Sequence, residues 1–284
     1  MNSNFVVASD IGGTHITSAV VDINTWQILE DTISRCHVNS RSDAKSIFFS
    51  WCSSISKAIE SCNSSISQLG IAMPGPFDYE NGISLMKNQD KYDALYQVSV
   101  TNGILDSLNT EKDIRFINDA AAFLQGEIFA GNLQHKDRIL GITLGTGLGS
   151  AVWNKGDKAF DADLWNAPYR SDIFEEYLVT RWFTKRFAAL SGRQEDGFKD
   201  IITKYRDTAA FDQLMGEYST ALYDFLCFFA EKHDSNTFII GGNIANAWDV
   251  INQYNDKIAK KFDIYTGQYA EKAAIIGAAS LFSN

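Results

Sequence analysis

The chain has 284 residues, of which 45% are hydrophobic and 13% aromatic, so it is long enough for two globular domains with substantial cores. Its formal net charge of -10 argues against nucleic acid as a partner, because binding a phosphate backbone needs a basic surface, whereas a small phosphorylated ligand remains compatible. No basic-then-apolar signal segment opens the chain and no apolar run is long enough to span a membrane, so we expect a cytoplasmic protein with no membrane partner.

The first predicted element is a strand, turn and strand over residues 6–22, with the sequence VVASDIGGTHITSAVVD. An apolar strand ends at Asp10, and the residues after the glycine pair alternate as in a half-buried strand. Gly12 and Gly13 permit positive φ, which directs successive N–H groups into a concavity that suits an anionic oxygen. Asp10 lies beside this turn, where it could hold a divalent cation on the anion. An ordinary hairpin with a glycine turn is the alternative.

The following segments continue a mixed α/β domain. Residues 26–38 are predicted to form a third strand, and apolar residues at helical spacing predict a helix over residues 42–62, capped by Ser42 or Asp43. A buried strand over residues 68–73 ends at the rigid Pro-Gly-Pro loop that contains Gly75. Residues 78–96 have no clear period, and a loop of that length is more often functional than idle.

The second half of the chain also contains a strand, glycine turn and strand. A strand over residues 113–117 leads through Asn118 and Asp119 into a helix over residues 120–131, and residues 139–153 form another strand, glycine turn and strand. From residue 173 the chain is largely helical, and the long run 211–233 has an aromatic face that we assign to the core or to a dimer interface. A strand over residues 237–240 and an Ala-rich helix over residues 271–282 complete the pattern.

The two glycine hairpins, ASDIGGTHITSAVV and GITLGTGLGSAVW, share one order of strand, turn and alternating strand. Coincidence is one explanation, but an internal duplication explains better why each half of the chain opens in this way. Two such turns facing one another across a cleft could clamp a polyphosphate from both sides. The sequence contains no GxxxxGK[ST] motif and no GxGxxG at a strand-to-helix turn, which excludes a P-loop NTPase and argues against a Rossmann dinucleotide site.

Six motifs together resemble the ROK family of sugar kinases, which are glucokinase-like enzymes of the actin/hexokinase superfamily. In chain order they are DIGGTHITSAVVD, GIAMPGPFD, FINDAAAFLQGE, ITLGTGLGSAV, FIIGGNIAN and AAIIGAASL. The resemblance implies two ribonuclease H-like α/β domains, with mixed sheets flanked by helices and a ligand cleft between them. We expect a smaller domain of residues 1–118 plus 270–284 and a larger domain of residues 119–269. The resemblance also implies a homodimer.

The resemblance implies roles for residues at matching positions. It places the nucleotide phosphates at two turns, near a Mg²⁺ ion at Asp10, and the adenosine at a third turn. It makes Asp119 the general base that takes the proton of a sugar hydroxyl as the γ-phosphoryl group of ATP transfers. The phosphate turns are Gly12, Gly13, Thr14 and Gly145, Thr146, Gly147; the adenosine turn is Gly241, Gly242, Asn243; and the sugar site is Gly75, Asn88, Asn118, Asp119, Asp163, Asn166, Glu175.

Two of these assignments have structural alternatives. Asp119 opens a helix, where its carboxylate also suits the helix dipole, so an N-cap is the other interpretation. Asn88 lies in the polar loop after Pro-Gly-Pro and is equally well explained as a solvated loop residue.

The chain departs from the family in one region. Where many members have a GExGH segment and then a CxCGxxGC zinc cluster, this chain has DADLWNAPYRSDIFEEYL. We align Asp163 with the family glutamate, Asn166 with the histidine and Glu175 with a later glutamate. The four cysteines of the chain form no CxxC pair, so we expect free thiols and no structural zinc. An asparagine in place of the histidine leaves the sugar preference open.

The sequence therefore predicts an ATP- and Mg²⁺-dependent hexose kinase. Glucose is the first candidate substrate, and N-acetylmannosamine, N-acetylglucosamine, mannose and fructose are alternatives. A sugar-responsive regulator is a further alternative, but the first hairpin begins at Phe5 and leaves no room for an N-terminal helix-turn-helix. An actin-like scaffold is the last alternative, which the Asn118–Asp119 pair disfavours.

Overall fold

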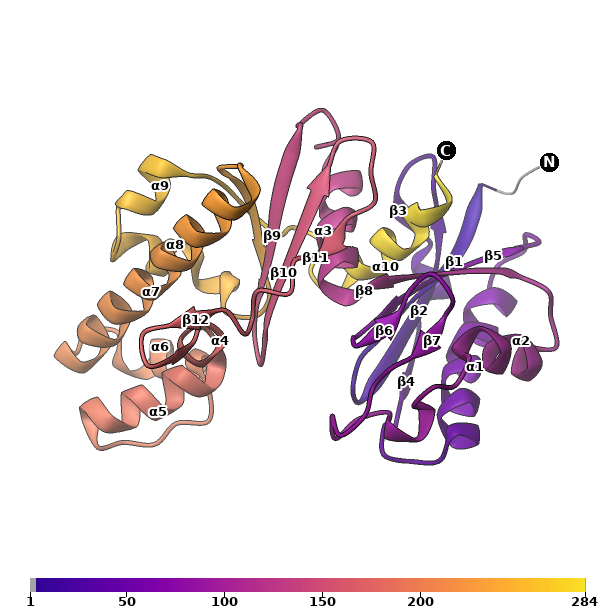
Figure 1. Ribbon diagram of the computed structural model, residues 1–284, viewed down its shortest axis with the longest axis horizontal. Helices are drawn as coiled ribbons and strands as arrows, with labels where there is room; N and C mark the ends of the chain where they lie inside the picture. Colours follow the sequence, from indigo (N-terminus) through magenta and orange to yellow (C-terminus); the bar gives the residue numbers. More distant parts are fainter. Residues whose placement is uncertain (1–3, 284) are drawn as a thin grey trace. The chain divides into compact units, whose positions relative to one another are not determined.

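The computed structural model describes residues 4–283. The chain forms two compact units, one of Met1–His135, Gly156–Phe160 and Glu271–Asn284, and one of Lys136–Lys155 and Asp161–Ala270. Each unit is built on a mixed sheet with helices packed on it, which confirms the predicted α/β fold class (Figure 1). The four cysteines are free thiols, as predicted. Within residues 4–283, no helix has both the length and the apolar character needed to cross a membrane.

The sheet of the first unit has the strand order β3-β2-β1-β5-β8, with β4 also paired to β2. β1 and β2 form an antiparallel hairpin, and β5 and β8 then add to β1 in parallel. The strands are β1 (Phe5–Ile11), β2 (His15–Asp22), β3 (Gln27–Ile28), β4 (Ser34–His37), β5 (Gln68–Met73) and β8 (Asp113–Asn118).

The single strand predicted for residues 26–38 is wrong, because a 3₁₀ turn at Glu30–Thr32 separates β3 from β4. Thr32 explains the break. Its Oγ1 donates to the Leu29 carbonyl at 2.7 Å and accepts the Val20 N–H at 2.8 Å, which bends the chain beside β2.

Helices cover both faces of this sheet (Figure 1). Val7 and Ile11 of β1 pack in one cluster with Ile47 and Trp51 of α1, and α10 also contacts β1. The predicted cap of α1 is confirmed as Asp43, which accepts the Ser46 N–H at 3.0 Å. The helices are α1 (Ala44–Glu60), α2 (Val100–Leu108), α3 (Asp119–Ala130) and α10 (Glu271–Ala279).

Two glycines let α3 and α10 approach until their backbones touch. A Cβ at Gly126 would lie 1.8 Å from the Ala273 carbonyl oxygen, and one at Gly277 would lie 1.9 Å from that of Ala122. Both helices are therefore buried on almost every side. Because of this contact α3 belongs to the first compact unit, although the sequence-based boundary at residue 118 assigns it to the other domain.

The sheet of the second unit, β11-β10-β9-β14-β15, repeats the order of the first. β9 and β10 form the antiparallel hairpin, and β14 and β15 extend it in parallel. This shared topology agrees with the internal duplication inferred from the two hairpin sequences. The strands are β9 (Arg138–Leu144), β10 (Leu148–Asn154), β11 (Phe160–Asp161), β14 (Thr237–Gly241) and β15 (Asp263–Thr266), with a separate hairpin of β12 (Pro168–Tyr169) and β13 (Asp172–Ile173).

An aromatic core holds the helices of the second unit together. Phe183 of α5 stacks on Phe198 of α6 with ring centroids 3.9 Å apart, and it meets the tilted ring of Tyr218 of α7 at a centroid distance of 4.4 Å. The apolar face predicted for the long helix is fully buried, so it belongs to the core. The helices are α4 (Glu175–Leu178), α5 (Thr180–Ser191), α6 (Phe198–Tyr205), α7 (Ala209–His233), α8 (Trp248–Gln253) and α9 (Lys257–Lys261).

Candidate active site

The carboxyl ends of the parallel strands in the first unit gather the predicted site residues of that unit. β1 ends beside Asp10 and its glycine turn, β5 ends at the loop that contains Gly75, and β8 ends at Asn118. The register pairs Asp10 with Ala72 and Met73 with Asn118, so these ends lie next to one another. This edge of an open α/β sheet is where ligands usually bind.

The first glycine turn, Gly12–Thr14, is open on its outer side. The Gly12 N–H donates to the His15 carbonyl at 2.8 Å, and a Cβ at Gly13 would meet no atom within 4 Å. The expected positive φ is wrong for both glycines, because neither is in the left-handed region. Their use here is the room they leave for a ligand to approach the backbone.

Tyr92 holds this turn in place from the buried side. Its ring is fully buried against Trp51, and its hydroxyl donates to the Gly12 carbonyl at 2.5 Å. Tyr92 takes φ 58, an unfavourable value for an aromatic residue. The sequence offered no signal for this contact, because Tyr92 lies in a polar segment with no period.

Asn118 and Asp119 divide two tasks at the start of α3. Asn118 is the N-cap: its Oδ1 accepts the N–H groups of Ala120 and Ala121 at 2.9 and 3.1 Å, and only 7% of the residue is exposed. Asp119 is exposed, and within residues 4–283 its carboxylate accepts only the Ala120 N–H, at 2.9 Å. The helix therefore does not need Asp119 as its cap, and the carboxylate is free to act on a ligand.

Asp10 has the most strongly perturbed carboxylate at this edge. Burial, followed by the charges of Asp119 and Glu271, raises the pKa of Asp10 from 3.8 to about 7, and Arg35 opposes this. Its side chain makes no hydrogen bond to any part of residues 4–283. A cation beside it would relieve the cost of ionising this carboxylate.

The donor set suits a metal that is shared with a phosphate ligand. Among the described residues, no three or more His, Cys, Asp or Glu side chains are arranged to hold a metal ion by themselves. Mg²⁺ usually binds through one or two carboxylates together with substrate phosphates. Asp10, half-buried and without a hydrogen-bond partner in the described part of the chain, fits that use.

The loop after β5 is more ordered than the predicted structureless segment. It forms a small hairpin of β6 (Phe77–Asp78) and β7 (Ile83–Ser84) and a 3₁₀ turn at Asp93–Leu95. Tyr79 connects it to the site, because its hydroxyl donates to the Met73 carbonyl at 2.9 Å and accepts from Asn118 Nδ2 at 3.3 Å. Gly75 lies under this hydroxyl. Asn88 is exposed, with φ 57.

The second unit has its own glycine turn, Gly145–Gly147, between β9 and β10. None of its glycines takes positive φ, and a Cβ at Gly145 would meet no atom within 4 Å. Glu175 lies at this turn, where its Oε2 accepts the Leu148 N–H at 3.0 Å. Sequence alignment assigned Glu175 to the sugar site. In the structure its carboxylate contacts the main chain at the end of the second glycine turn.

The turn after β14 packs against the end of β9. A Cβ at Gly242 would lie 2.3 Å from the Leu144 carbonyl oxygen, and Gly242 takes φ 87, so only glycine fits. The Ile244 N–H then donates to the same oxygen at 3.1 Å. The structure thus brings Gly241, Gly242 and Asn243 next to the second glycine turn.

Asp163 and Asn166 lie on an exposed segment of the second unit. Asp163 takes φ 51, and its Oδ1 accepts the indole N–H of Trp165 at 2.8 Å. Asn166 is exposed. The Asp163 carboxylate is therefore already engaged with a neighbouring side chain, which sequence alignment to a family glutamate did not foresee.

Comparisons with known proteins agree on one family. Residues 6–159 match the model of the ROK family. Over 88 residues the chain is 35% identical to the glucokinase of Thermotoga maritima, a stretch that covers 31% of this chain and 26% of that relative. The match thus spans about a quarter of the curated relative.

Solved structures resemble the whole chain. A ROK family glucokinase from Streptomyces griseus, in complex with glucose and AMPPNP, superposes with a TM-score of 0.73 at 22% identity and covers 98% of each chain. A ROK hexokinase from Thermus thermophilus gives a TM-score of 0.77 at 16% identity and covers 97% of this chain and 96% of that one. At these identities the likeness concerns the fold.

Proposed function

The chain belongs to the ROK family, and on that premise we propose that it is a kinase that transfers the γ-phosphoryl group of ATP to a hydroxyl of a hexose, with glucose as the first candidate. The observation that carries the proposal is that Asn118 and Asp119 have different roles at the start of α3. Asn118 caps the helix, so the adjacent Asp119 presents an exposed carboxylate at the ligand-binding edge of the sheet.

In the proposed mechanism Asp119 accepts the proton of the attacking sugar hydroxyl, which needs a carboxylate within hydrogen-bond reach. The main-chain N–H groups of the two glycine turns bind the phosphates, and most of the rate enhancement comes from positioning and charge neutralisation. Asp10 would help to hold Mg²⁺, which neutralises phosphate charge when it is bound. The third turn, Gly241–Asn243, would contact the adenosine.

Sugar contacts are proposed for residues of both units. In the first, Gly75, Asn88 and Asn118 are the candidates, and the Asn118 amide has one N–H left after capping and its bond to Tyr79. In the second, Asp163, Asn166 and Glu175 are the candidates. Because Asp163 and Glu175 already accept hydrogen bonds, they would bind a sugar through their remaining lone pairs.

The test is ADP release by the purified chain with ATP and Mg²⁺ over a panel of glucose, N-acetylmannosamine, N-acetylglucosamine, mannose and fructose. We expect turnover with at least one of these hexoses. Sugar binding without any turnover would favour the non-catalytic regulator, and ATP-dependent polymerisation without sugar phosphorylation would favour the scaffold.

A further inference from the structure

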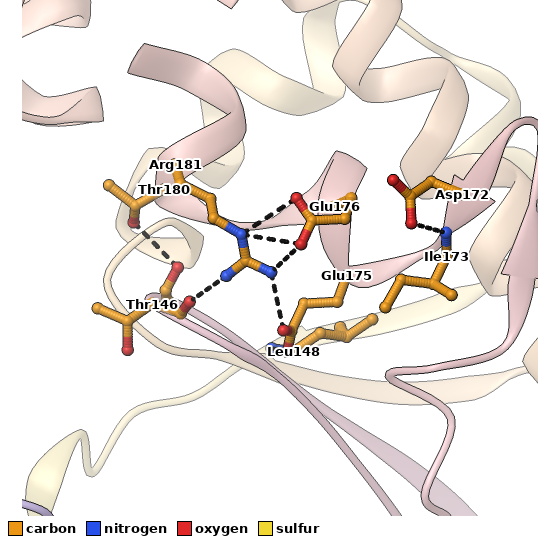
Figure 2. Close-up of polar contacts among 9 residues, drawn as sticks. Thr146, Leu148, Asp172, Ile173, Glu175, Glu176, Thr180 and Arg181 are labelled. Carbon is orange, nitrogen blue, oxygen red and sulfur yellow. Dashed lines mark hydrogen bonds and ion pairs between the residues drawn. The ribbon is translucent and has the colours of Figure 1, made fainter. Parts of the chain in front are cut away.

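The second glycine turn is held in place by the start of α5. The Thr180 N–H and its Oγ1 both donate to the Gly145 carbonyl, at 2.8 and 2.9 Å, and Arg181 Nη1 donates to the Thr146 carbonyl at 3.2 Å (Figure 2). Two successive carbonyl oxygens of the turn are therefore tied to one helix.

These bonds decide where the N–H groups of the turn point. In a planar trans peptide the N–H points away from the preceding carbonyl oxygen. Fixing the carbonyls of Gly145 and Thr146 toward α5 therefore directs the N–H groups of Thr146 and Gly147 to the opposite side. Neither N–H donates to an acceptor within residues 4–283. Adjacent unpaired N–H groups of this kind form an anion site.

Arg181 also controls the charge beside the turn. Its Nη2 contacts Glu175 Oε1 at 2.9 Å and Glu176 Oε1 at 2.6 Å (Figure 2). The other oxygen of Glu175 accepts the Leu148 N–H and would lie 3.3 Å from a Cβ at Gly147. Hydrogen bonds from Arg181 lower the pKa of Glu176, so that carboxylate stays ionised. Without Arg181, two carboxylates at this turn would repel a phosphate.

We propose that Arg181 is a positioning residue for the nucleotide phosphates, which aims the N–H groups of the second glycine turn and offsets the charge of Glu175 and Glu176. The proposal rests on the proposed function, because it assumes that this turn binds a nucleotide. Arg181 touches the backbone of the turn, and its proposed effect on the phosphates passes through that backbone.

A second ion pair on α5 provides a matched control. Arg186 makes two 2.6 Å hydrogen bonds to Glu217 of α7. The Arg186 side chain is 34% exposed, close to the 37% of Arg181. No hydrogen bond joins Arg186 to the second glycine turn in the described part of the chain. Loss of Arg186 therefore removes a comparable arginine–glutamate pair from the same helix without releasing Thr146.

The experiment measures the Kd of AMPPNP with Mg²⁺ by calorimetry, and the KM of ATP and of the sugar, for the wild-type chain, Arg181→Gln, Arg181→Lys and Arg186→Gln. We expect Arg181→Gln to raise the Kd and the KM of ATP about tenfold and to leave the KM of the sugar within about twofold. Arg181→Lys keeps the charge but loses the planar fork, so we expect an intermediate value. Arg186→Gln should change neither constant.

The outcomes separate the two proposals. If the wild-type chain binds the nucleotide and phosphorylates a sugar, but Arg181→Gln matches Arg186→Gln in both constants, the role of Arg181 is wrong and the proposed function stands. A fall in kcat alone, with unchanged Kd, would mean that Arg181 acts on the chemical step and not on nucleotide binding, which also overturns the inference. If Arg181→Gln does not fold, the comparison of Arg181→Lys with Arg186→Lys decides in the same way. No nucleotide binding by the wild-type chain overturns both proposals.

Discussion

Asp10 and Asp119 are neighbouring carboxylates with different surroundings, and this difference should be measurable. Asp10 is half-buried with a pKa raised to about 7 by burial and by the charge of Asp119, whereas Asp119 is exposed. Such divergent environments are typical of sites in which one carboxylate serves a metal and another serves a proton transfer.

The first prediction concerns Mg²⁺ and pH. The proposed Mg²⁺ site requires the ionised form of Asp10, so the apparent affinity for Mg²⁺ should fall as the pH drops through about 7. Titration of Mg²⁺ against activity at a fixed ATP concentration, at several pH values around that point, measures the trend. Asp10→Asn should bind Mg²⁺ weakly with little pH dependence. An affinity of the wild-type chain that does not change with pH would contradict the prediction.

The second prediction concerns stability without metal. A carboxyl whose pKa is higher in the folded state than in the unfolded state holds more protons when folded, so stability falls as the pH rises from about 4 to about 7. Asp10→Asn lacks this loss and should be more stable than wild type at alkaline pH, with an upper limit of about 4 kcal/mol. Urea denaturation at both ends of the range measures it. Equal stability of the two proteins at both ends would refute it.

At the scale of elements, each glycine turn is shaped by a partner that lies elsewhere in the chain. Tyr92 holds Gly12, and α5 holds Gly145 and Thr146. The sequence located both turns, because glycines after an apolar strand are a local signal. It missed Tyr92 and Arg181, because a side chain that reaches a distant carbonyl leaves no periodic pattern. It also misjudged the φ angles of the turn glycines, none of which is positive at Gly12, Gly13, Gly145 or Gly147.

The third prediction tests the Tyr92 contact. Tyr92→Phe keeps the buried ring but removes the donor to the Gly12 carbonyl, which frees the peptide that precedes Gly13. We expect the KM of ATP to rise about fivefold, which corresponds to the free energy that one neutral hydrogen bond contributes. Tyr254→Phe is the control, because it removes a hydroxyl that donates to Asp212 in the second unit. Steady-state kinetics measure the KM of ATP for both variants. The same KM for Tyr92→Phe and Tyr254→Phe would contradict a role of Tyr92 in nucleotide binding.

The fourth prediction tests the contact of α3 with α10. Gly126→Ala would place a methyl group 1.8 Å from a backbone oxygen, so the helices must separate, and we expect a loss of about 1–3 kcal/mol. Gly216→Ala is the matched control, because that position lies inside α7 and has no atom within 4 Å. It should stabilise the chain by about 0.5–1 kcal/mol. Thermal denaturation compares the two, and equal effects would show that the close approach is not needed.

For the whole molecule, local pattern and repetition in the sequence predicted most of the architecture. The α/β class, the two glycine hairpins, the cap at Asp43 and the buried face of α7 are all consequences of hydrophobic period and turn chemistry. The placement of α3 could not be predicted from such local patterns. It depends on contacts of Gly126 and Gly277, which are more than a hundred residues apart in the chain. The engagement of Asp163 with Trp165 is likewise a result of folding.

The central claim is that Asp119 is the base of a sugar kinase, and the comparison of Asp119→Asn with wild type tests it most directly. The measurement is kcat with the best sugar of the panel, together with the Kd of that sugar. We predict a fall in kcat of about 10²–10⁴-fold with a nearly unchanged Kd, because the amide cannot accept the hydroxyl proton. Asp106→Asn, an exposed carboxylate on α2, should keep full activity. Full activity of Asp119→Asn would contradict the account.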